Sequence, residues 1–192
     1  MKASDWDARY ETAGVWSREP NAWIAATLEH LDPGTAVDLA AGEGRNALWL
    51  AGLGWEVTAV DYSAVGLATG KERATELGVD VEWVVADATT WVSPTLVDLV
   101  VIAYLQLPAE ELSRAIGTAA GYLAPGGTLA LINHDRDNLV RGVGGPQDPA
   151  VLATVEELTH AASVLDIVEC RQVDRVTPNG IAIDVVLVAR AH

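Results

Sequence analysis

Short apolar segments alternate along the chain with longer segments in which apolar residues recur at helical spacing. Continuous or alternating apolar residues, typical of strands, occupy residues 35–40, 56–61, 81–87, 96–104 and 128–133. Helical spacing is found between them, at residues 45–54, 64–78 and 108–123. This alternation predicts an α/β domain whose parallel sheet carries helices on both faces.

Both ends of the chain depart from this alternation. A helix is predicted over residues 21–30, before the first strand. Near the other end, residues 163–173 and 181–191 are two strand-like segments separated by Pro178, Asn179 and Gly180, which favour a turn. They predict a C-terminal antiparallel hairpin. Residues 134–150 form a polar segment without periodicity, which we interpret as a long loop of the kind that often carries function.

The length of 192 residues indicates one domain over 1–192, with an N-terminal helical lid or extension at 1–31 and a core at 35–192. The formal net charge is −15, from 27 acidic and 12 basic residues, which opposes binding to nucleic acids and to anionic membranes. A single cysteine, Cys170, excludes an intramolecular disulfide. The first residues contain no apolar segment of a signal peptide, so we expect a cytoplasmic protein.

Candidate chemistry gathers where the predicted strands end, because ligands of open α/β sheets bind beyond the carboxyl ends of the strands. The first strand runs into the turn AGEG, where Gly42 and Gly44 allow a ligand close to the backbone. Asp61 ends the second strand, in the place where a carboxylate can accept both hydroxyls of a ribose. Asp87 ends the third strand and could face an adenine amino group.

Two cofactors fit a ribose and an adenine in this position. Gly42, Gly44 and Ala47 satisfy the dinucleotide pattern G-x-G-x-x-G/A, which keeps an NAD(P)-dependent oxidoreductase open. However, the chain contains no Tyr-x-x-x-Lys pair. S-adenosylmethionine is the alternative, because its ammonium and sulfonium are cationic and acidic groups near the turn would favour it. Asp38, just before the turn, could serve that ammonium or could only brace the turn.

Four segments in order, VDLAAGEGRNA, AVDYS, VVADAT and LAPGG-TLAL, resemble the motifs of class I S-adenosylmethionine-dependent methyltransferases, over roughly residues 35–135. The N-terminal WDARY…VWSREPNAW and the loop GGPQDP are similar to the small bacterial group of tellurite-resistance and thiopurine-type methyltransferases. The resemblance implies a Rossmann-like, seven-stranded, mostly parallel sheet. It also implies a cofactor site formed by Asp38, Ala40, Gly42, Gly44, Asn46, Asp61, Tyr62, Asp87, Ala88 and Ala103. One departure is Ala40, where the family commonly has glycine.

The methyl acceptor and any catalytic base are less well marked. Candidates for a base near the site are His134, Tyr104 and Tyr10. The Asn/Asp-Pro-Pro-aromatic motif of nucleic-acid amino methyltransferases is absent, and IAYLQLP stands in its place. With the acidic charge, this favours a small-molecule acceptor. We expect no metal, and either a monomer or a homodimer. A catalytically silent S-adenosylmethionine-binding protein is a further alternative.

Overall fold

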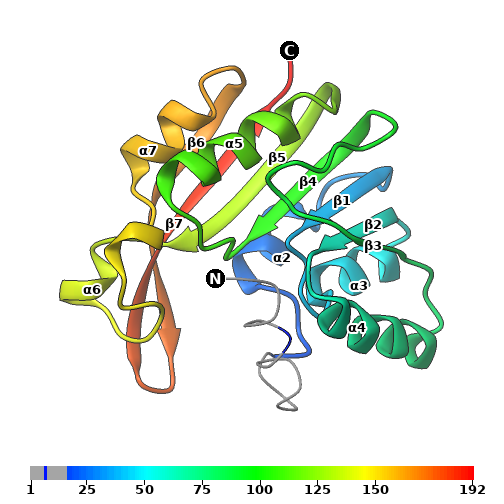
Figure 1. The fold of residues 1–192 in the computed structure, drawn as a ribbon, viewed down its shortest axis with the longest axis horizontal. Coiled ribbons are helices and arrows are strands. Elements are labelled where there is room, and N and C mark those ends of the chain that lie inside the picture. The colour runs from blue at the N-terminus through cyan, green and yellow to red at the C-terminus, as the bar shows by residue number, and fades with distance from the viewer. Residues whose placement is uncertain (1–6, 8–16) are drawn as a thin grey trace.

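A seven-stranded sheet forms the centre of the computed structural model, which describes residue 7 and residues 17–192 (Figure 1). The strands are β1 (Thr35–Leu39), β2 (Glu56–Asp61), β3 (Glu82–Val85), β4 (Val97–Ala103), β5 (Leu123–His134), β6 (Asp166–Thr177) and β7 (Gly180–Arg190). Their order across the sheet is β3-β2-β1-β4-β5-β7-β6. Strands β1 to β5 pair in parallel, whereas β7 is antiparallel to both β5 and β6.

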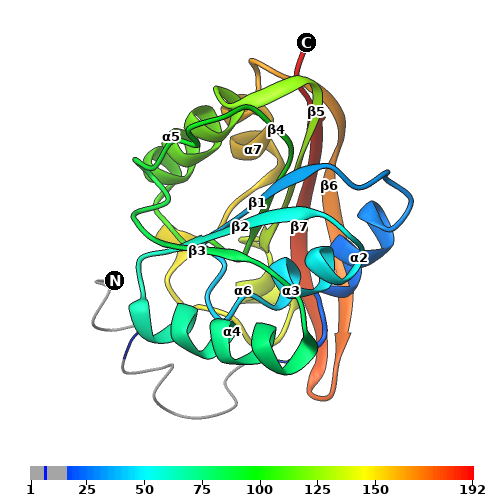
Figure 2. The same cartoon turned by 90° about the vertical axis from the view of Figure 1, so that its right-hand side faces the viewer.

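Helices cover both faces of this sheet, as the alternation along the chain predicts (Figure 2). One face carries α2 (Ala22–Leu28), α3 (Arg45–Gly52) and α4 (Ala64–Leu77), and the other carries α5 (Ala109–Ala120) and α7 (Val155–Ala161). Strand β4 contributes to the apolar core on both faces of the sheet. Leu99 and Val101 pack into one apolar cluster, and Val100 and Ile102 pack into the other. All four are fully buried, which explains the nearly continuous apolar character of this strand.

Capping residues give the helices next to the site their positions. The Asn21 side chain accepts hydrogen bonds from the amides of Trp23 and Ile24 and so begins α2. Ser63 begins α4 by accepting from Gly66 N, and Gly78 ends that helix in the left-handed conformation, at φ 68°. Both ends of α4 therefore lie close to their predicted positions.

Three regions differ from the elements predicted above. Helix α7 lies in a segment for which no helix is predicted, and Thr154 caps it. Strand β5 begins five residues before the predicted strand because Pro125–Gly127 form a bulge within it. Strand β6 begins three residues after its predicted start, and both strands extend to a turn of only Pro178 and Asn179, so the connecting loop is shorter than predicted. The loop 134–150 contains the short helix α6 (Asn138–Arg141) and most of the 3₁₀ turn η1 (Pro149–Val151).

Two predictions concern the ends of the chain and its relation to membranes. Among the described residues, no helix is both long and apolar enough to cross a bilayer. Most of the segment predicted as a lid, with Tyr10, lies outside the described residues. The prediction of one domain over 1–192 stays a prediction.

Candidate functional site

A cavity of about 1000 Å³, its open mouth included, lies at the carboxyl ends of β1, β2 and β4. This is where the strand order reverses between β1 and β4, the position at which open α/β sheets bind ligands. Its lining comes from the turn after β1, the ends of β2 and β3, and the segment after β4. These residues are Ala40, Ala41, Gly42, Glu43, Arg45, Asn46, Asp61, Tyr62, Asp87, Ala88, Ala103, Tyr104, Leu105, Gln106 and Leu107.

The turn after β1 is built on alternating left-handed residues. Ala40, Gly42 and Gly44 have φ angles of 62°, 58° and 72°. An alanine in this conformation costs roughly 1 kcal/mol, whereas glycine adopts it freely. Ala40 therefore adopts a conformation that favours glycine, the residue that commonly stands there.

Asp61 braces this turn from the end of β2. Its Oδ2 accepts a hydrogen bond from Gly42 N at 2.9 Å, and its Oδ1 accepts one from Ser63 N at 2.8 Å. Burial raises the pKa of Asp61 above its ordinary value, although these backbone hydrogen bonds oppose the shift. Asp61 also lines the cavity, so one carboxylate both shapes the turn and faces the ligand space.

Asp38 lies beneath the turn and is not among the lining residues. Its Oδ2 accepts a hydrogen bond from Ala47 N at 3.0 Å, which ties the end of β1 to the start of α3. Its buried Oδ1 has no hydrogen-bond partner among the described residues. Burial raises the pKa of Asp38 to about 7. Asp38 thus braces the start of α3, and its role toward the cofactor stays a prediction.

Gly44 is also absent from the lining. A Cβ atom at this position would lie 2.5 Å from the Trp83 ring, and a Cβ at Gly70 of α4 would meet the same ring at 2.5 Å. Gly44 therefore lets Trp83 pack beneath the turn, and it does not open a path to the ligand space.

The other predicted cofactor residues do line the cavity. Asn46, almost fully buried in α3, accepts a hydrogen bond from Asn21 N at 2.9 Å and so joins α2 to the wall. Asp87 Oδ1 accepts from Thr89 N at 2.8 Å, which shapes the loop after β3. Tyr62, Ala88 and Ala103 lie on the same wall.

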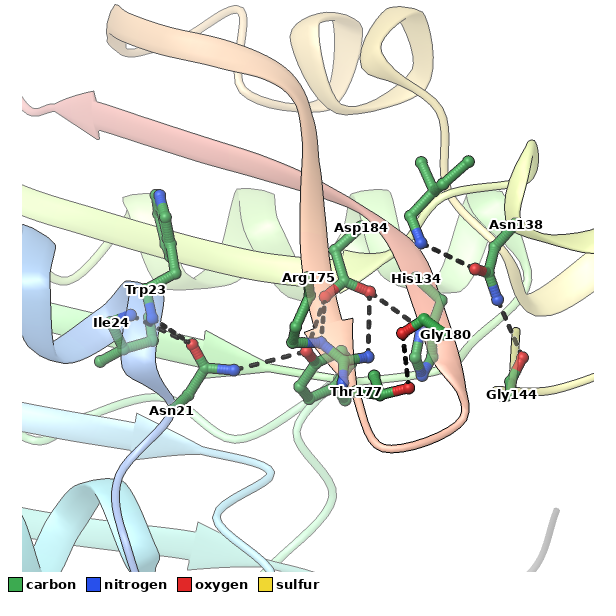
Figure 3. A network of polar contacts seen from close by, with 12 residues as sticks. Asn21, Trp23, Ile24, His134, Asn138, Gly144, Arg175, Thr177, Gly180 and Asp184 are labelled. Carbon is green, nitrogen blue, oxygen red and sulfur yellow. Dashed lines mark hydrogen bonds and ion pairs between the residues drawn. The ribbon is translucent and has the colours of Figure 1, made fainter. Parts of the chain in front are cut away.

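The three candidate bases have different outcomes. Tyr104 lines the cavity, but its hydroxyl donates to Asp184 Oδ2 at 2.9 Å. Burial, with the adjacent Asp184 charge, raises the pKa of Tyr104 well above its ordinary value, so the hydroxyl stays protonated. His134 is not in the lining, and its Nδ1 lies 2.9 Å from Asp184 Oδ1 (Figure 3). Tyr10 lies outside the described residues.

Sequence reasoning missed six lining residues. Ala41, Glu43 and Arg45 belong to the predicted turn and helix start, and Leu105, Gln106 and Leu107 follow β4. The end of β4 was itself a signal for the second group, because every strand end of the parallel sheet faces this edge. Glu43 carries a further role, since its carboxylate pairs with Arg73 of α4 at 2.9 Å.

Comparison with known proteins identifies the domain. Residues 36–127 match the model of a family described as "Methyltransferase domain". This match identifies residues 36–127 as a methyltransferase domain. The matched residues begin in β1 and run into the β5 bulge, and so include the whole turn and the lining after β4. This match supports the methyltransferase interpretation over an NAD(P)-dependent oxidoreductase. A solved structure of the same fold holds S-adenosyl-L-homocysteine, the product of S-adenosylmethionine, which agrees with the cofactor predicted above.

Two solved structures show the same fold. TehB from Haemophilus influenzae is 18% identical with a TM-score of 0.75, and the match covers 100% of this chain and 68% of that chain. N-methyltransferase NodS from Bradyrhizobium japonicum WM9, in complex with S-adenosyl-L-homocysteine, is 18% identical with a TM-score of 0.73, over 98% and 97% of the two chains. The predicted seven-stranded fold is confirmed.

One curated relative is matched in sequence. The chain is 31% identical over 105 residues to ribosomal RNA small subunit methyltransferase C of Alcanivorax borkumensis. The match covers 52% of this chain, and it spans only about a third (32%) of that relative. The similarity therefore leaves about two thirds of that relative without a counterpart in the match.

Proposed function

We propose that this methyltransferase transfers the methyl group of S-adenosylmethionine to a small-molecule acceptor bound in the cavity at the carboxyl edge of the sheet. The proposal is supported by the lining of this cavity, which joins two groups of residues around one space. The braced turn and the ends of β2 and β3 form one side, and residues 103–107 after β4 form the other. A donor and an acceptor can therefore meet in one cavity.

The cofactor occupies the side formed by β1, β2 and β3 in this proposal. Asp61 accepts the ribose hydroxyls, and Asp87 with Ala88 lies at the adenine. The backbone at Ala40, Gly42 and Ala103 faces the methionine part. Asp61 and Asp87 in the lining support a cationic ligand, because opposite charges attract across a partly dry cavity. The third lining carboxylate, Glu43, is paired with Arg73, and the lining also contains Arg45.

Methyl transfer is an in-line displacement in which the acceptor's nucleophilic atom bonds to the methyl carbon as the bond from carbon to sulfur breaks. The protein contributes chiefly by aligning the two molecules and excluding water. Among the described lining residues there is no histidine, cysteine or lysine. The Tyr104 hydroxyl is protonated and donates to Asp184, so it does not serve as the base.

A small acceptor is favoured over a nucleic acid by charge. The formal net charge is −15, and five arginines are each paired with a carboxylate: Arg73, Arg136, Arg141, Arg171 and Arg175. These pairs reduce the positive potential that a phosphate backbone requires. The segment after β4 reads IAYLQLP, which lacks the Asn/Asp-Pro-Pro-aromatic motif. A cytoplasmic location and a monomeric or homodimeric state belong to the same proposal.

The first test concerns the cofactor. S-adenosylhomocysteine and NADH are titrated separately while melting temperature and tryptophan fluorescence are recorded. At 100 times its Kd, a ligand of the folded state adds about 2.7 kcal/mol to the free energy of unfolding. We expect a higher melting temperature with S-adenosylhomocysteine alone, and loss of that shift in Asp61→Asn. A shift with NADH alone would overturn the proposal.

The second test concerns the acceptor. Methyl transfer from radiolabelled S-adenosylmethionine is measured with thiophenol, benzylamine and catechol, and with ribosomal small subunits as a competing substrate. We expect labelling of at least one small probe and none of the ribosomal RNA. Labelled RNA would replace the small-molecule proposal. Cofactor binding with no labelling of any substrate would favour the silent binding protein.

A further inference from the structure

A polar network centred on the buried Asp184 (Figure 3) reaches Tyr104 of the cavity lining. Asp184 of β7 is fully buried and meets groups from three other segments. Tyr104 Oη donates to its Oδ2 at 2.9 Å, and Arg175 Nε of β6 donates to the same oxygen at 2.6 Å. His134 Nδ1, at the end of β5, lies 2.9 Å from its Oδ1.

The register of the sheet brings these groups together. His134 pairs directly with Asp184 across β5 and β7. Arg175 is two residues beyond Val173, the residue of β6 that pairs with Asp184, so its side chain points to the same face of the sheet. Its guanidinium carbon lies 5.6 Å from the centre of the Tyr104 ring. The network is therefore built into three adjacent strands and ends at Tyr104.

The Tyr104 backbone shows why such support is needed. Tyr104 has φ 59°, a left-handed conformation that a bulky residue adopts only when its surroundings hold it there. Its amide donates to Ile132 O at 2.8 Å, and its hydroxyl is held by Asp184. This turn of the backbone sends Leu105, Gln106 and Leu107 along the cavity, where they form its lining.

A second buried side chain supports the same segment. Asn133, fully buried at the end of β5, donates its Nδ2 to Leu105 O at 2.9 Å. From the side of α2, Asn21 Nδ2 donates to Tyr104 Oη at 3.4 Å. The segment after β4 is thus fixed at successive residues by side chains from β5, β7 and the start of α2.

We propose that Asp184 is a positioning residue for the methyl acceptor, acting through the Tyr104 hydroxyl to hold residues 104–107 at the acceptor side of the cavity. This inference rests on the proposed function, because it assigns that side of the lining to the acceptor. The strand order supports the assignment. The cofactor side is formed by the ends of β1, β2 and β3, and residues 104–107 lie beyond them at β4.

The kinetic test uses Tyr104→Phe and Asp184→Asn, with Asp166→Asn as the control. Phenylalanine removes only the hydroxyl, and asparagine removes the charge at constant shape. Asp166 is an exposed carboxylate of β6, paired with His192 at the opposite end of the hairpin. Calorimetry gives the Kd of S-adenosylhomocysteine. The acceptor's kcat and KM are measured with whichever probe, thiophenol, benzylamine or catechol, the unmodified protein methylates.

We expect kcat/KM for the acceptor to fall at least tenfold in both site variants, while the Kd of S-adenosylhomocysteine changes less than threefold. The double variant should be little worse than either single variant, because the two residues act as one unit. The control should match the unmodified protein. The positioning role would be overturned if cofactor affinity and kcat/KM for the acceptor fell by the same factor, or if kcat/KM did not change.

A structural readout separates this proposal from the proposed function. In a crystal structure of Tyr104→Phe with S-adenosylhomocysteine, we expect residue 104 to leave the left-handed region and residues 105–107 to shift relative to the turn. A positive φ with an unmoved segment would refute the positioning role. If the unmodified protein methylates none of the three probes, the proposed function fails, and this comparison then decides only whether Asp184 and Tyr104 hold residues 104–107 in place.

Discussion

At the scale of single residues, Gly42 is the position where turn geometry and ligand space coincide. It has φ 58°, donates to Asp61 and lines the cavity. We predict that Gly42→Val weakens binding of S-adenosylhomocysteine at least a hundredfold, because a branched side chain would occupy the ligand space. The left-handed backbone adds a stability cost of about 1–3 kcal/mol. Calorimetry and thermal unfolding measure the two effects.

Gly52→Val is the matched control for this substitution. Gly52 ends α3, the helix that follows the turn, and a Cβ atom there meets nothing within 4 Å. We expect the Kd of S-adenosylhomocysteine for Gly52→Val to stay within threefold of its value for the unmodified protein. Unaltered affinity in Gly42→Val would mean that the turn is a tight corner without a ligand.

A second prediction concerns Asp38 and how its contribution to folding stability depends on pH. Burial raises its pKa from 3.8 to about 7, so between these values the folded protein binds a proton that the unfolded chain releases. The contribution of Asp38 to stability therefore falls as pH rises from about 4 to about 7. A shift of this size corresponds to at most roughly 4 kcal/mol.

Asp38→Asn removes this titration and keeps an acceptor for the amide of Ala47. We predict that the variant gains stability relative to the unmodified protein as pH rises from 4 to 8, measured by urea unfolding at each pH. Asp98→Asn is the comparison, because hydrogen bonds from Thr35 lower the pKa of Asp98 and its effect has the opposite sign. A difference for Asp38→Asn that does not change with pH would contradict the raised pKa.

Residue roles at the site could be predicted only in part. The lining includes Asp61 and Asp87 because an acid that ends a parallel strand must reach the sheet's ligand-binding edge. Asp38 and Gly44 lie in the same motif, yet the first braces α3 and the second faces Trp83. The pattern of the turn does not distinguish these uses, because they depend on which tertiary neighbour packs beneath it.

At the scale of elements, the strands and helices with strong periodicity were predictable, and the differences have local causes. Helix α7 has only seven residues, so its periodicity is weak. Its signal was Thr154 followed three residues later by Glu157, a capping pattern whose Thr154 hydroxyl accepts from Glu157 N. Pro125–Gly127 indicated a turn, but β4 pairs with β5 on both sides of it and makes it a bulge.

A prediction for helix α4 concerns how tightly it packs against Trp83 and the turn after β1. Gly70 lies in its interior, where alanine normally stabilises a helix by about 0.8–1.0 kcal/mol. Here a Cβ would lie 2.5 Å from the Trp83 ring and 2.8 Å from Glu43 O. We predict that Gly70→Ala instead destabilises the protein by about 1–3 kcal/mol, because overpacking outweighs helix propensity.

Gly117→Ala in α5 is the matched control, since a Cβ there meets nothing within 4 Å. It should raise the free energy of unfolding, so that urea unfolding of the two variants gives opposite signs. Because Glu43 belongs to the turn, Gly70→Ala should also weaken S-adenosylhomocysteine binding. Stabilisation by both substitutions would show that Trp83 moves aside at little cost.

At the scale of the whole molecule, the network that supports the proposed acceptor side is assembled from residues distant in sequence. Tyr104, His134, Arg175 and Asp184 meet only because β7 inserts between β5 and β6. No spacing rule along the chain relates these four positions. The sequence therefore predicts the cofactor side, which is nearly contiguous from residue 38 to 88, better than the acceptor side.

The net charge of the whole molecule bears on whether it binds nucleic acid. The similarity to a ribosomal RNA methyltransferase covers 52% of this chain, while the net charge of −15 opposes contact with phosphates. Binding to nucleic acid draws much of its free energy from release of counterions by lysine and arginine. In this chain arginines such as Arg136 and Arg141 are paired with Glu157 and Asp137.

We therefore predict no binding of a fluorescently labelled ribosomal RNA hairpin up to about 100 µM protein at physiological salt, measured by anisotropy, since even non-specific binders reach a Kd of roughly 10⁻⁴–10⁻⁶ M. Saturation with S-adenosylhomocysteine should not change this result. A basic RNA-binding protein titrated under the same conditions is the positive control. Binding that weakens as salt rises would reveal a local basic surface that overrides the net charge, and would favour an RNA acceptor.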